Sequence, residues 1–228
     1  MKGDCKEMER WRVKFAVEGR MAFLSHLDML TAWERAMRRA DFPVLLSEGF
    51  NTHMLISFGP AHAVGMKSVA DYFDIDMADG LDKNKWQSLN GLLPRGLFVL
   101  EARIIPRNTK PLMAVINIAA YEAELDYSSI DGGEREAVVN NHIKEFLLLD
   151  ECLVERVSPK GRKLFDIRSG VKKLSYLYEG LYMEVSVGQD GNVRPAEVVN
   201  KVFQDIPILS CRRTGLFIDD TDGRRETP

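Results

Sequence analysis

The order of the hydrophobic patterns predicts an α+β protein made of two consecutive units with the same arrangement of strands and helices. In the first unit, strand-like and helix-like periodicities follow one another as β-α-β-β-α-β. A looser copy begins after residues 106–111, a proline-bounded linker. This is the order of a ferredoxin-like unit. We therefore expect tandem ferredoxin-like domains at residues 1–106 and 112–218, the second decorated with an extra helix and strand, and a disordered tail at residues 219–228.

The first unit opens with a strand and a capped helix. Between Trp11 and Val17, large apolar residues alternate with polar or small ones, which predicts a strand with one buried face. Ser25 can cap the helix that follows, with Asp28 completing a capping box. The core stripe of this helix comprises Met29, Trp33, Ala36, Met37 and Ala40, and the helix ends at Asp41 and Pro43.

Three further strands and a helix complete the first unit. Val44–Leu46 and Leu55–Phe58 are short apolar runs, and Val69–Met77 alternates with Phe73, Ile75 and Met77 inward. The second helix presents Leu81, Trp86, Leu89 and Leu93 to the core, and the strand Leu97–Ile104 follows.

The second unit repeats this order less regularly. It has predicted strands at 115–125, 152–157, 163–168 and 181–187, a short segment at 171–178, and a helix at 134–149 with Val139, Ile143, Phe146 and Leu147 on one face. A helix opened by Pro195 and a strand near 209–218 come last. The pattern leaves open whether these last two elements decorate the second unit or pair with the first.

Composition narrows the class of protein. With 45% hydrophobic residues the chain can bury a core, while its longest apolar runs are too short to span a bilayer and its N-terminus lacks a secretory signal. We expect a cytoplasmic protein. Cys5, Cys152 and Cys211 are scattered, so we expect structural thiols and no metal, iron–sulfur cluster or other cofactor. The net charge of -3 excludes an indiscriminate polyanion binder.

Residues 19–68 carry a set of motifs. They are Gly19-Arg20, Phe23 to Asp28, Arg35 with Arg38-Arg39, Ser47 with Gly49 to Asn51, His53, Ile56 to Phe58, and Gly65 with Ser68. The chain thereby resembles the radical-SAM-linked family, a bacterial domain of unknown function that is fused to a radical-SAM module or encoded separately. The resemblance implies a separate radical-SAM enzyme as partner. Thr52, Met54 and Leu55 depart from the family pattern, and the C-x-x-x-C-x-x-C motif is missing, so this chain cannot itself hold the cluster.

Two histidines of this region are candidate catalytic residues. In a β-α-β-β-α-β unit, the start of the first helix and the loop after the second strand approach each other, so we expect His26, Asp28, Asn51 and His53 to converge. His26 and Asp28 do not face each other on a helix, and no recognised nucleophile or metal ligand accompanies His53. The alternative is that neither histidine is catalytic.

Two basic clusters are candidate RNA or phosphate contacts. Arg35, Arg38 and Arg39, with Asn51, extend the first region, although for such a charge stripe taken alone a solvated helix face with a Glu34–Arg38 pair is the favoured explanation. The second cluster lies on a predicted hairpin and comprises Lys160, Arg162, Lys163 and Arg168, where the alternative is an ordinary soluble turn. The open sheet face would instead pair Arg12 and Lys14 with Asp74 and Asp76, which disfavours RNA stacking there.

These observations give three functional hypotheses. The first is an RNA-associated accessory protein that acts with a separate radical-SAM enzyme in RNA modification or processing and has no activity on its own. The second is a hydrolase or nuclease using His26 or His53. The third is a protein-interaction scaffold without a nucleic-acid ligand. A ligand held jointly by His26, Asp28 and His53 would favour the enzyme, and a large apolar patch on the first unit would favour the scaffold.

Overall fold

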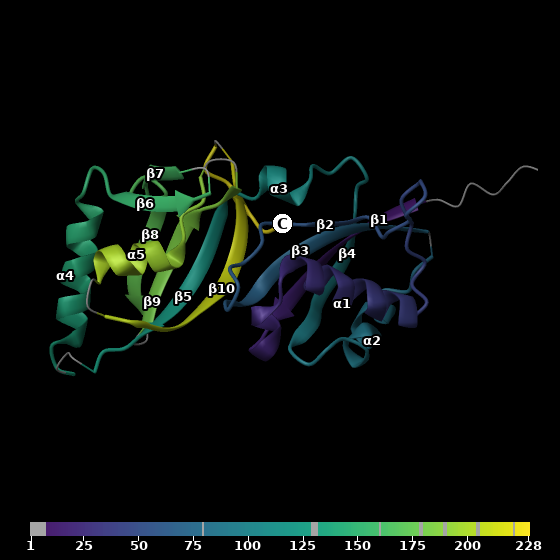
Figure 1. Cartoon of the computed structure of the whole chain (residues 1–228), viewed down its shortest axis with the longest axis horizontal. Coiled ribbons are helices and arrows are strands. Elements are labelled where there is room, and N and C mark those ends of the chain that lie inside the picture. The colour runs from purple at the N-terminus through teal and green to yellow at the C-terminus, as the bar shows by residue number, and fades with distance from the viewer. Residues whose placement is uncertain are drawn as a thin grey trace, which may run out of the picture. The chain divides into compact units, whose positions relative to one another are not determined.

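A computed structural model of the chain contains two compact units, residues 1–115 together with Pro228, and residues 116–227 (Figure 1). It describes residues 8–78, 80–128, 132–159, 161–177, 180–188, 191–203, 206–220 and 222–228. Both units combine antiparallel strands with few helices, so the predicted α+β class is confirmed. No helix in the described ranges is long and apolar enough to cross a membrane.

The first unit follows the predicted order of elements. Its elements are β1 (Met8–Val17), η1 (Gly19–Phe23), α1 (His26–Arg39), β2 (Ile56–Phe58), β3 (Lys67–Ala78), α2 (Asn84–Ser88), η2 (Leu89–Gly91), β4 (Leu97–Ile105) and α3 (Leu112–Val115). The strands lie in the order β4-β1-β3-β2, each antiparallel to its neighbour. The two central strands are therefore β1 and β3.

The core of the first unit forms where both helices cover one face of this sheet, as Figure 1 shows for α1 and α2 in front of the strands. The strand residues predicted to point inward are fully buried there, as are the predicted helix residues Trp33 and Trp86. Trp33 packs edge-on against Phe15 and Phe73, with ring centroids 5.3 and 4.9 Å apart. The helix α1 ends where Asp41 adopts a φ of 50°, two residues before Pro43.

The second unit is also built mainly from antiparallel strands. Its elements are β5 (Ile118–Leu125), α4 (Arg135–Leu147), β6 (Leu153–Ser158), β7 (Gly161–Asp166), β8 (Val171–Leu177), β9 (Gly180–Ser186), α5 (Pro195–Val202), β10 (Ile208–Asp219) and β11 (Arg225–Glu226). The strands lie in the order β10-β5-β9-β8, and β11 pairs with β10. Of the face predicted for α4, Val139, Ile143 and Phe146 are buried, whereas Leu147 is partly exposed.

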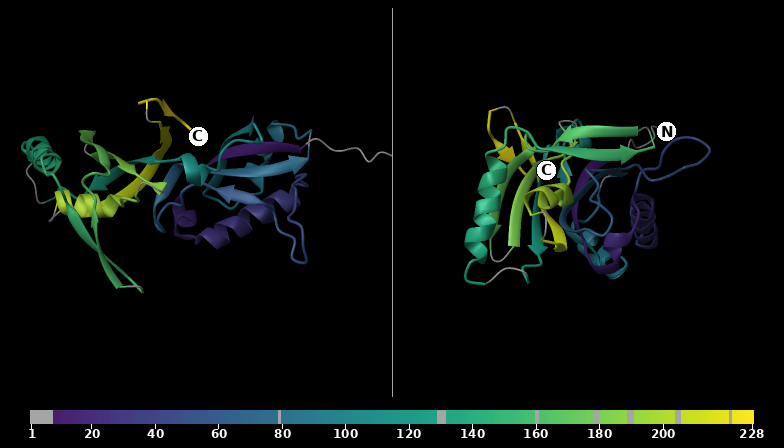
Figure 2. Two further views of the ribbon diagram at one scale, coloured as in Figure 1. Left: turned by 90° about the horizontal axis from the view of Figure 1, so that it is seen from above. Right: turned by 60° about the vertical axis from the view of Figure 1, so that its left-hand side comes forward.

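The sequence left open where the last predicted helix and strand belong. The elements found there, α5 and β10, lie in the second unit, and β10 pairs with β5 along most of its length. The two-stranded ribbon β6–β7 pairs with no other described strand and projects from its unit in Figure 2. Val154, buried near its base, and Arg156, bonded to Glu197 on α5 at 2.6 and 2.7 Å, anchor the ribbon.

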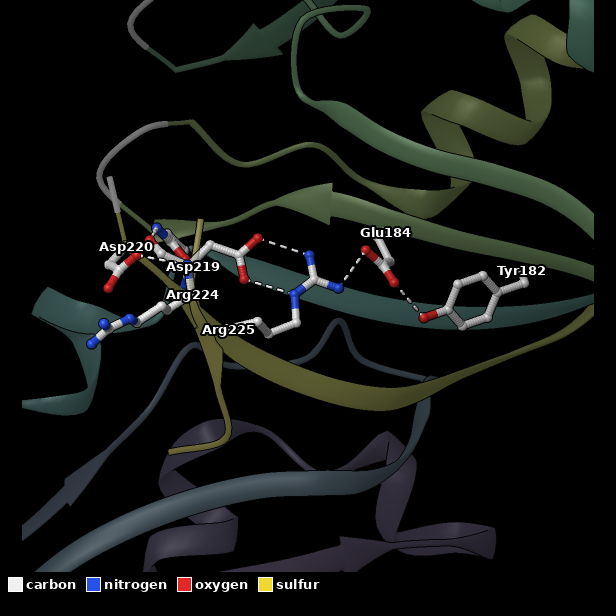
Figure 3. Close-up of polar contacts among 7 residues, drawn as sticks. Tyr182, Glu184, Asp219, Asp220, Arg224 and Arg225 are labelled. Carbon is white, nitrogen blue, oxygen red and sulfur yellow. Dashed lines mark hydrogen bonds and ion pairs between the residues drawn. The ribbon is translucent and has the colours of Figure 1, made fainter. Parts of the chain in front are cut away.

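The C-terminal segment is also more ordered than predicted. Arg225 on β11 donates two hydrogen bonds of 2.7 Å to Asp219 and one of 2.8 Å to Glu184 (Figure 3). Glu184 also accepts a hydrogen bond of 2.7 Å from Tyr182. Because these contacts tie β11 to β9 and β10, the expectation of a disordered tail at residues 219–228 is wrong for the residues that the structure describes.

Candidate functional site

A cavity of about 140 Å³ lies in the first unit, between the junction of η1 with α1, the loop that follows β2, and the start of β3. Its polar lining consists of His26, His62, Asp71 and Tyr72, and its aromatic lining includes Phe15 and Phe58. The flat segment Gly59-Pro60-Ala61 completes one wall. Concave sites that combine apolar walls with a few polar groups are typical ligand sites.

The floor of the cavity is a chain of hydrogen-bonded side chains. His62 Nδ1 lies 2.7 Å from one carboxylate oxygen of Asp71, and the hydroxyl of Ser68 donates to the other. The side chains of His62 and Asp71 are each only 6% exposed. With both carboxylate oxygens engaged, the imidazole is held in one orientation, since an acidic partner at Nδ1 fixes the ring and leaves Nε2 for other contacts.

The arrangement is not a serine hydrolase triad, although it contains the three residue types. In such a triad the histidine bonds the nucleophilic serine through Nε2 and the acid through Nδ1. Here Ser68 bonds the acid instead of the histidine. The cavity therefore has an oriented imidazole without an attached nucleophile, which suits either ligand binding or proton transfer to a ligand.

His26 reaches the same cavity from the first turn of α1. Ser25 caps this helix by accepting a hydrogen bond of 3.2 Å from the backbone of Asp28, which confirms the predicted cap, and its hydroxyl donates to the Asp28 carboxylate. The cap fixes where the helix begins and hence the position of His26. Its ring packs edge-on against Phe58, with centroids 4.8 Å apart.

Tyr72 lines the cavity as a residue of β3, but its ring lies on the opposite face of the sheet. It pairs in register with Lys14, whose ammonium is 5.8 Å from the ring centroid, whereas Asp71 pairs with Phe15 on the helix-covered face. Burial is the main reason that the pKa of this phenol rises to about 12, with the nearby Glu101 carboxylate raising it further. The ionisable side chains that face the cavity are therefore His26, His62 and Asp71.

Exposed apolar side chains surround the cavity. Phe23, Leu27 and Val64 are 69, 72 and 68% exposed, although Val64 also lines the cavity and Leu27 follows His26 directly. The Phe23 ring lies beside Gly65, where an added Cβ would come within 3.5 Å of it. Several exposed apolar side chains gathered at one place are typical of a surface that contacts a ligand or a partner.

The structure separates the two histidines that the sequence placed together. His53 lies in the exposed loop before β2, with Nδ1 2.9 Å from Ser47 Oγ, and neither it nor Asn51 lines the cavity that His26 enters. Asn51 is exposed in the same loop. Asp28 is occupied by its hydrogen bond with Ser25. The residue that accompanies His26 is thus His62.

The three arginines of α1 are exposed, as predicted. Among the residues that the structure describes, no ion pair joins Arg38 to Glu34, and Arg35 also has no acidic partner. Arg39 donates a hydrogen bond of 2.5 Å to the backbone carbonyl of Leu92. Two of the three guanidinium groups can therefore meet a phosphate without breaking a contact.

The residues of the second basic cluster differ in exposure and in their contacts. Arg162 and Lys163 are exposed on the ribbon, where Arg162 makes a long, exposed ion pair of 3.4 Å with Glu155. Arg168 is half-buried and donates to the backbone carbonyl of Leu147 at 2.8 Å, so it links β7 to the end of α4. Lys160 lies outside the described residues. The exposed ribbon cations remain candidate phosphate contacts.

Arg12 lies on the sheet in the predicted register with Asp74. It makes a bidentate ion pair with this carboxylate, at 2.7 and 2.9 Å, and Asp74 also accepts from Arg10 at 3.3 Å. Lys14 lies opposite Tyr72 instead of an acid, with its ammonium 5.8 Å from the ring centroid. Bidentate pairing holds the guanidinium of Arg12 away from any phosphate.

The described cysteines and acids do not suggest a metal centre. Cys152 and Cys211 are free thiols, and burial is the main reason that the pKa of Cys211 rises to about 11. A thiol with a raised pKa is a poor nucleophile and a poor metal ligand. No group of three or more histidines, cysteines or acids in the described ranges is arranged to hold a metal ion.

Comparison with known proteins places the chain in one family. The sequence model of the family described as "Uncharacterized protein conserved in bacteria (DUF2344)" matches residues 10–195. No curated protein matches the chain. Among the solved structures that match is a crystal structure described as a chlorite dismutase candidate, with 12% sequence identity over 86% of this chain and 85% of that chain. Its TM-score of 0.25 is too low to support any argument.

Proposed function

Since the chain belongs to this family of uncharacterized proteins conserved in bacteria, we propose that it is an RNA-associated accessory protein that acts with a separate radical-SAM enzyme. One observation supports the proposal that the protein binds RNA. A cavity lies at the first turn of α1, and the following turns of the same helix expose arginines. The link to a radical-SAM enzyme rests on the motifs between Gly19 and Ser68. The resemblance to the radical-SAM-linked family is thus the support for the partner, and the geometry is the support for the ligand.

The spacing along α1 suits a single nucleic-acid strand. Arg35 and Arg38 follow His26 by nine and twelve positions, or roughly 13 and 18 Å along the axis at ~1.5 Å per residue. This is a span of a few nucleotides at most. Single-stranded RNA is recognised by stacking and by hydrogen bonds to unpaired bases, while cations follow its backbone. Arginines on α1 would bind the backbone of a strand whose end or loop reaches the cavity.

Both units also fit the fold class that many RNA-binding modules use. We propose that each is a ferredoxin-like unit, the second with the β6–β7 ribbon inserted after α4. The support is that the two orders, β4-β1-β3-β2 and β10-β5-β9-β8, place the corresponding strands alike. A shared fold does not transfer function, so this proposal concerns architecture alone.

The test is RNA affinity as a function of salt concentration. Each phosphate contact with single-stranded RNA contributes a slope of about -0.7 in log affinity against log salt. A double variant, Arg35→Ala with Arg38→Ala, should therefore weaken binding and flatten the slope by about 1.4. The matched control removes two exposed linker cations, Arg107→Ala with Lys110→Ala, and should leave the slope nearly unchanged.

Two outcomes would contradict the proposal. If the wild-type protein binds no RNA even with the radical-SAM enzyme present, the ligand is wrong. If the α1 and linker variants lose affinity equally, the interaction is unspecific attraction to positive charge. Crosslinking in cells, followed by identification of bound RNA and protein together, tests the partner, because a radical-SAM enzyme should be recovered with the chain.

A second function is favoured by one specific observation, namely that His26 and His62 line the same cavity. An imidazole oriented by Asp71 and a second imidazole nearby can act as general base and general acid. A hydrolase or nuclease would then use these two histidines, with His53 excluded from the pair by its position. Incubating labelled RNA with the purified protein tests this hypothesis. RNA that stays intact after prolonged incubation, also with the radical-SAM enzyme present, would contradict a hydrolase or nuclease activity.

The exposed apolar side chains Phe23, Leu27 and Val64 support the third hypothesis, that the protein is an interaction scaffold without a nucleic-acid ligand. They also fit an accessory protein, which must contact its enzyme close to the bound RNA. Replacing Phe23 with Ser should weaken capture of the radical-SAM enzyme while leaving affinity for RNA alone unchanged. Loss of enzyme capture with no RNA affinity in any variant would make the scaffold the better description.

A further inference from the structure

The cavity beside α1 is lined by a histidine with one ring nitrogen that can bond a ligand. His62 is anchored through Nδ1 to Asp71, while its Nε2 makes no hydrogen bond to any other described residue. The side chain as a whole is only 6% exposed and lines the cavity. An oriented ring nitrogen in such a place is available to a ligand that enters the cavity.

The hydrogen bond to Asp71 sets what Nε2 offers. An ionised carboxylate only accepts hydrogen bonds, so Nδ1 carries a hydrogen. In the neutral imidazole Nε2 is then an acceptor that points to ligands with an N–H or O–H group. The cavity thus presents an acceptor, which matches an amino or imino group on the edge of a nucleobase.

The charge of the lining excludes a phosphate. Among the described residues, neither lysine nor arginine lines this cavity, whereas the carboxylate of Asp71 does. A phosphate would lie near a negative charge without a lysine or arginine to bind it, which is unfavourable in a site removed from water. The ligand group that enters is therefore neutral.

The walls favour a flat group of limited size. Phe15 and Phe58 supply aromatic surface, and the Gly59-Pro60-Ala61 segment carries only small side chains or a ring held against the backbone. A volume of about 140 Å³ is well below the ~300–1,000 Å³ of pockets for drug-sized ligands. One heteroaromatic ring system fits, whereas a whole nucleotide or a large cofactor does not.

We infer that this cavity is a binding site for one unpaired nucleobase of RNA, with His62 Nε2 accepting a hydrogen bond from the base. The inference rests on the proposed function, because it makes the base part of the strand that the α1 arginines hold. The phosphates stay outside the cavity, along α1. The edge-on contact of His26 with Phe58 places a second imidazole at the site, where it can stack on the base.

The experiment measures the contribution of a single base. The probe is a fluorescently labelled single-stranded RNA of about ten nucleotides, within the ~4–16 nucleotides that single-strand binding folds cover. A set of otherwise identical RNAs lacks the base at one position each. One position should lose about fivefold to a hundredfold in affinity, which corresponds to the loss of one stacked base.

Two substitutions of His62 distinguish the contact of Nε2 with the ligand from the hydrogen bond of Nδ1 with Asp71. In His62→Asn the amide nitrogen takes the place of Nδ1, so the hydrogen bond to Asp71 is kept and the ligand-facing atom is lost. In His62→Gln the amide reaches the place of Nε2. The penalty for the missing base should shrink by about threefold to tenfold in His62→Asn, as expected for one hydrogen bond, and should be partly restored in His62→Gln. His53→Asn, in the exposed loop, should behave as the wild type.

The outcomes distinguish this inference from the proposed function. If the RNA binds but no missing base matters, or the penalty is the same in His62→Asn, the cavity is not a base site and the α1 proposal stands. If the RNA does not bind at all, both are wrong. Thermal unfolding checks that the variants fold. Photo-crosslinking of wild-type protein to RNA containing 4-thiouridine is independent of any variant, and crosslinks confined to α1 or the ribbon would also overturn the inference.

Discussion

Replacement of buried tryptophans by phenylalanine tests whether hydrogen bonding of the indole N–H groups affects the stability of the first unit. Trp11, Trp33 and Trp86 are all completely or almost completely buried. The indole nitrogen of Trp11 donates to Glu9 at 3.0 Å, whereas those of Trp33 and Trp86 have no hydrogen-bond partner among the described residues. Substitution by phenylalanine therefore removes a hydrogen-bonded N–H at Trp11, and an N–H without a partner at Trp33 and at Trp86.

The expected energies differ between the two cases. Phenylalanine has about three fewer heavy atoms, and at ~0.8 kcal/mol per buried methylene-sized group this loss is about 2 kcal/mol. An unsatisfied buried N–H costs ~1–3 kcal/mol, which its removal recovers. Trp33→Phe and Trp86→Phe should thus be within about 1 kcal/mol of the wild type. Trp11→Phe loses a hydrogen bond as well and should cost roughly 3 kcal/mol.

The assay is urea unfolding followed by tryptophan fluorescence. All three tryptophans of the chain lie in the first unit, so each variant keeps two reporters of that unit and none of the other. An unchanged m-value shows that the same transition is compared. The reasoning fails if Trp33→Phe destabilises as much as Trp11→Phe, because the Trp33 nitrogen would then have a partner.

Three further predictions concern single features. Ser25→Ala should lower the free energy of unfolding by roughly 1 kcal/mol, because the hydroxyl that caps α1 is lost. Ser25→Asp is the control, since aspartate also caps helices and should restore the stability. Unchanged stability in Ser25→Ala would show that the cap does not stabilise the helix. Alanine at Lys160, Arg162 and Lys163 together should flatten the slope of log RNA affinity against log salt by up to about 2, at ~0.7 per phosphate contact, and an unaltered slope in a folded variant would contradict RNA contacts by the ribbon. Tyr72 and Tyr182, with pKa values raised to about 12 mainly by burial, should give ultraviolet absorbance changes well above pH 10, and completion of all phenol ionisation near pH 10 in the folded protein would contradict their burial. Because the unfolded phenols ionise near pH 10, the stability that these two groups contribute should be complete below that pH and lost as pH rises to about 12.

The regular parts of the first unit could be predicted because their local patterns agree with their burial. Val13, Phe15 and Val17 alternate in the sequence and are buried on one face of β1. The cap at Ser25 likewise follows from residues three apart, and both features are local. Sequence periodicity reports contacts of this kind well.

Strand pairing in the second unit could not be predicted in the same way. β6 and β7 have the composition of sheet strands, and only their lack of partners shows that they form a separate ribbon. Conversely, β10 lies near the end of the sequence but pairs with β5, which precedes it by more than 80 residues, as in the pair of Ile208 with Leu125. Which strand becomes the neighbour of which is decided by long-range packing, and hydrophobic periodicity gives no information about it.

The cavity residues illustrate a signal that sequence analysis can use. His62 lies in a loop with no motif spacing around it, so the sequence pattern favours His53 as the partner of His26. Asp71, however, falls inside a strand where its neighbours Ala70 and Phe73 are buried, and a carboxylate in such a strand must be paired to be stable. Asking which cation or donor can reach a carboxylate in an apolar strand would direct attention to Ser68 and His62. A buried charge is therefore a better guide to this site than the exposed histidine in the loop.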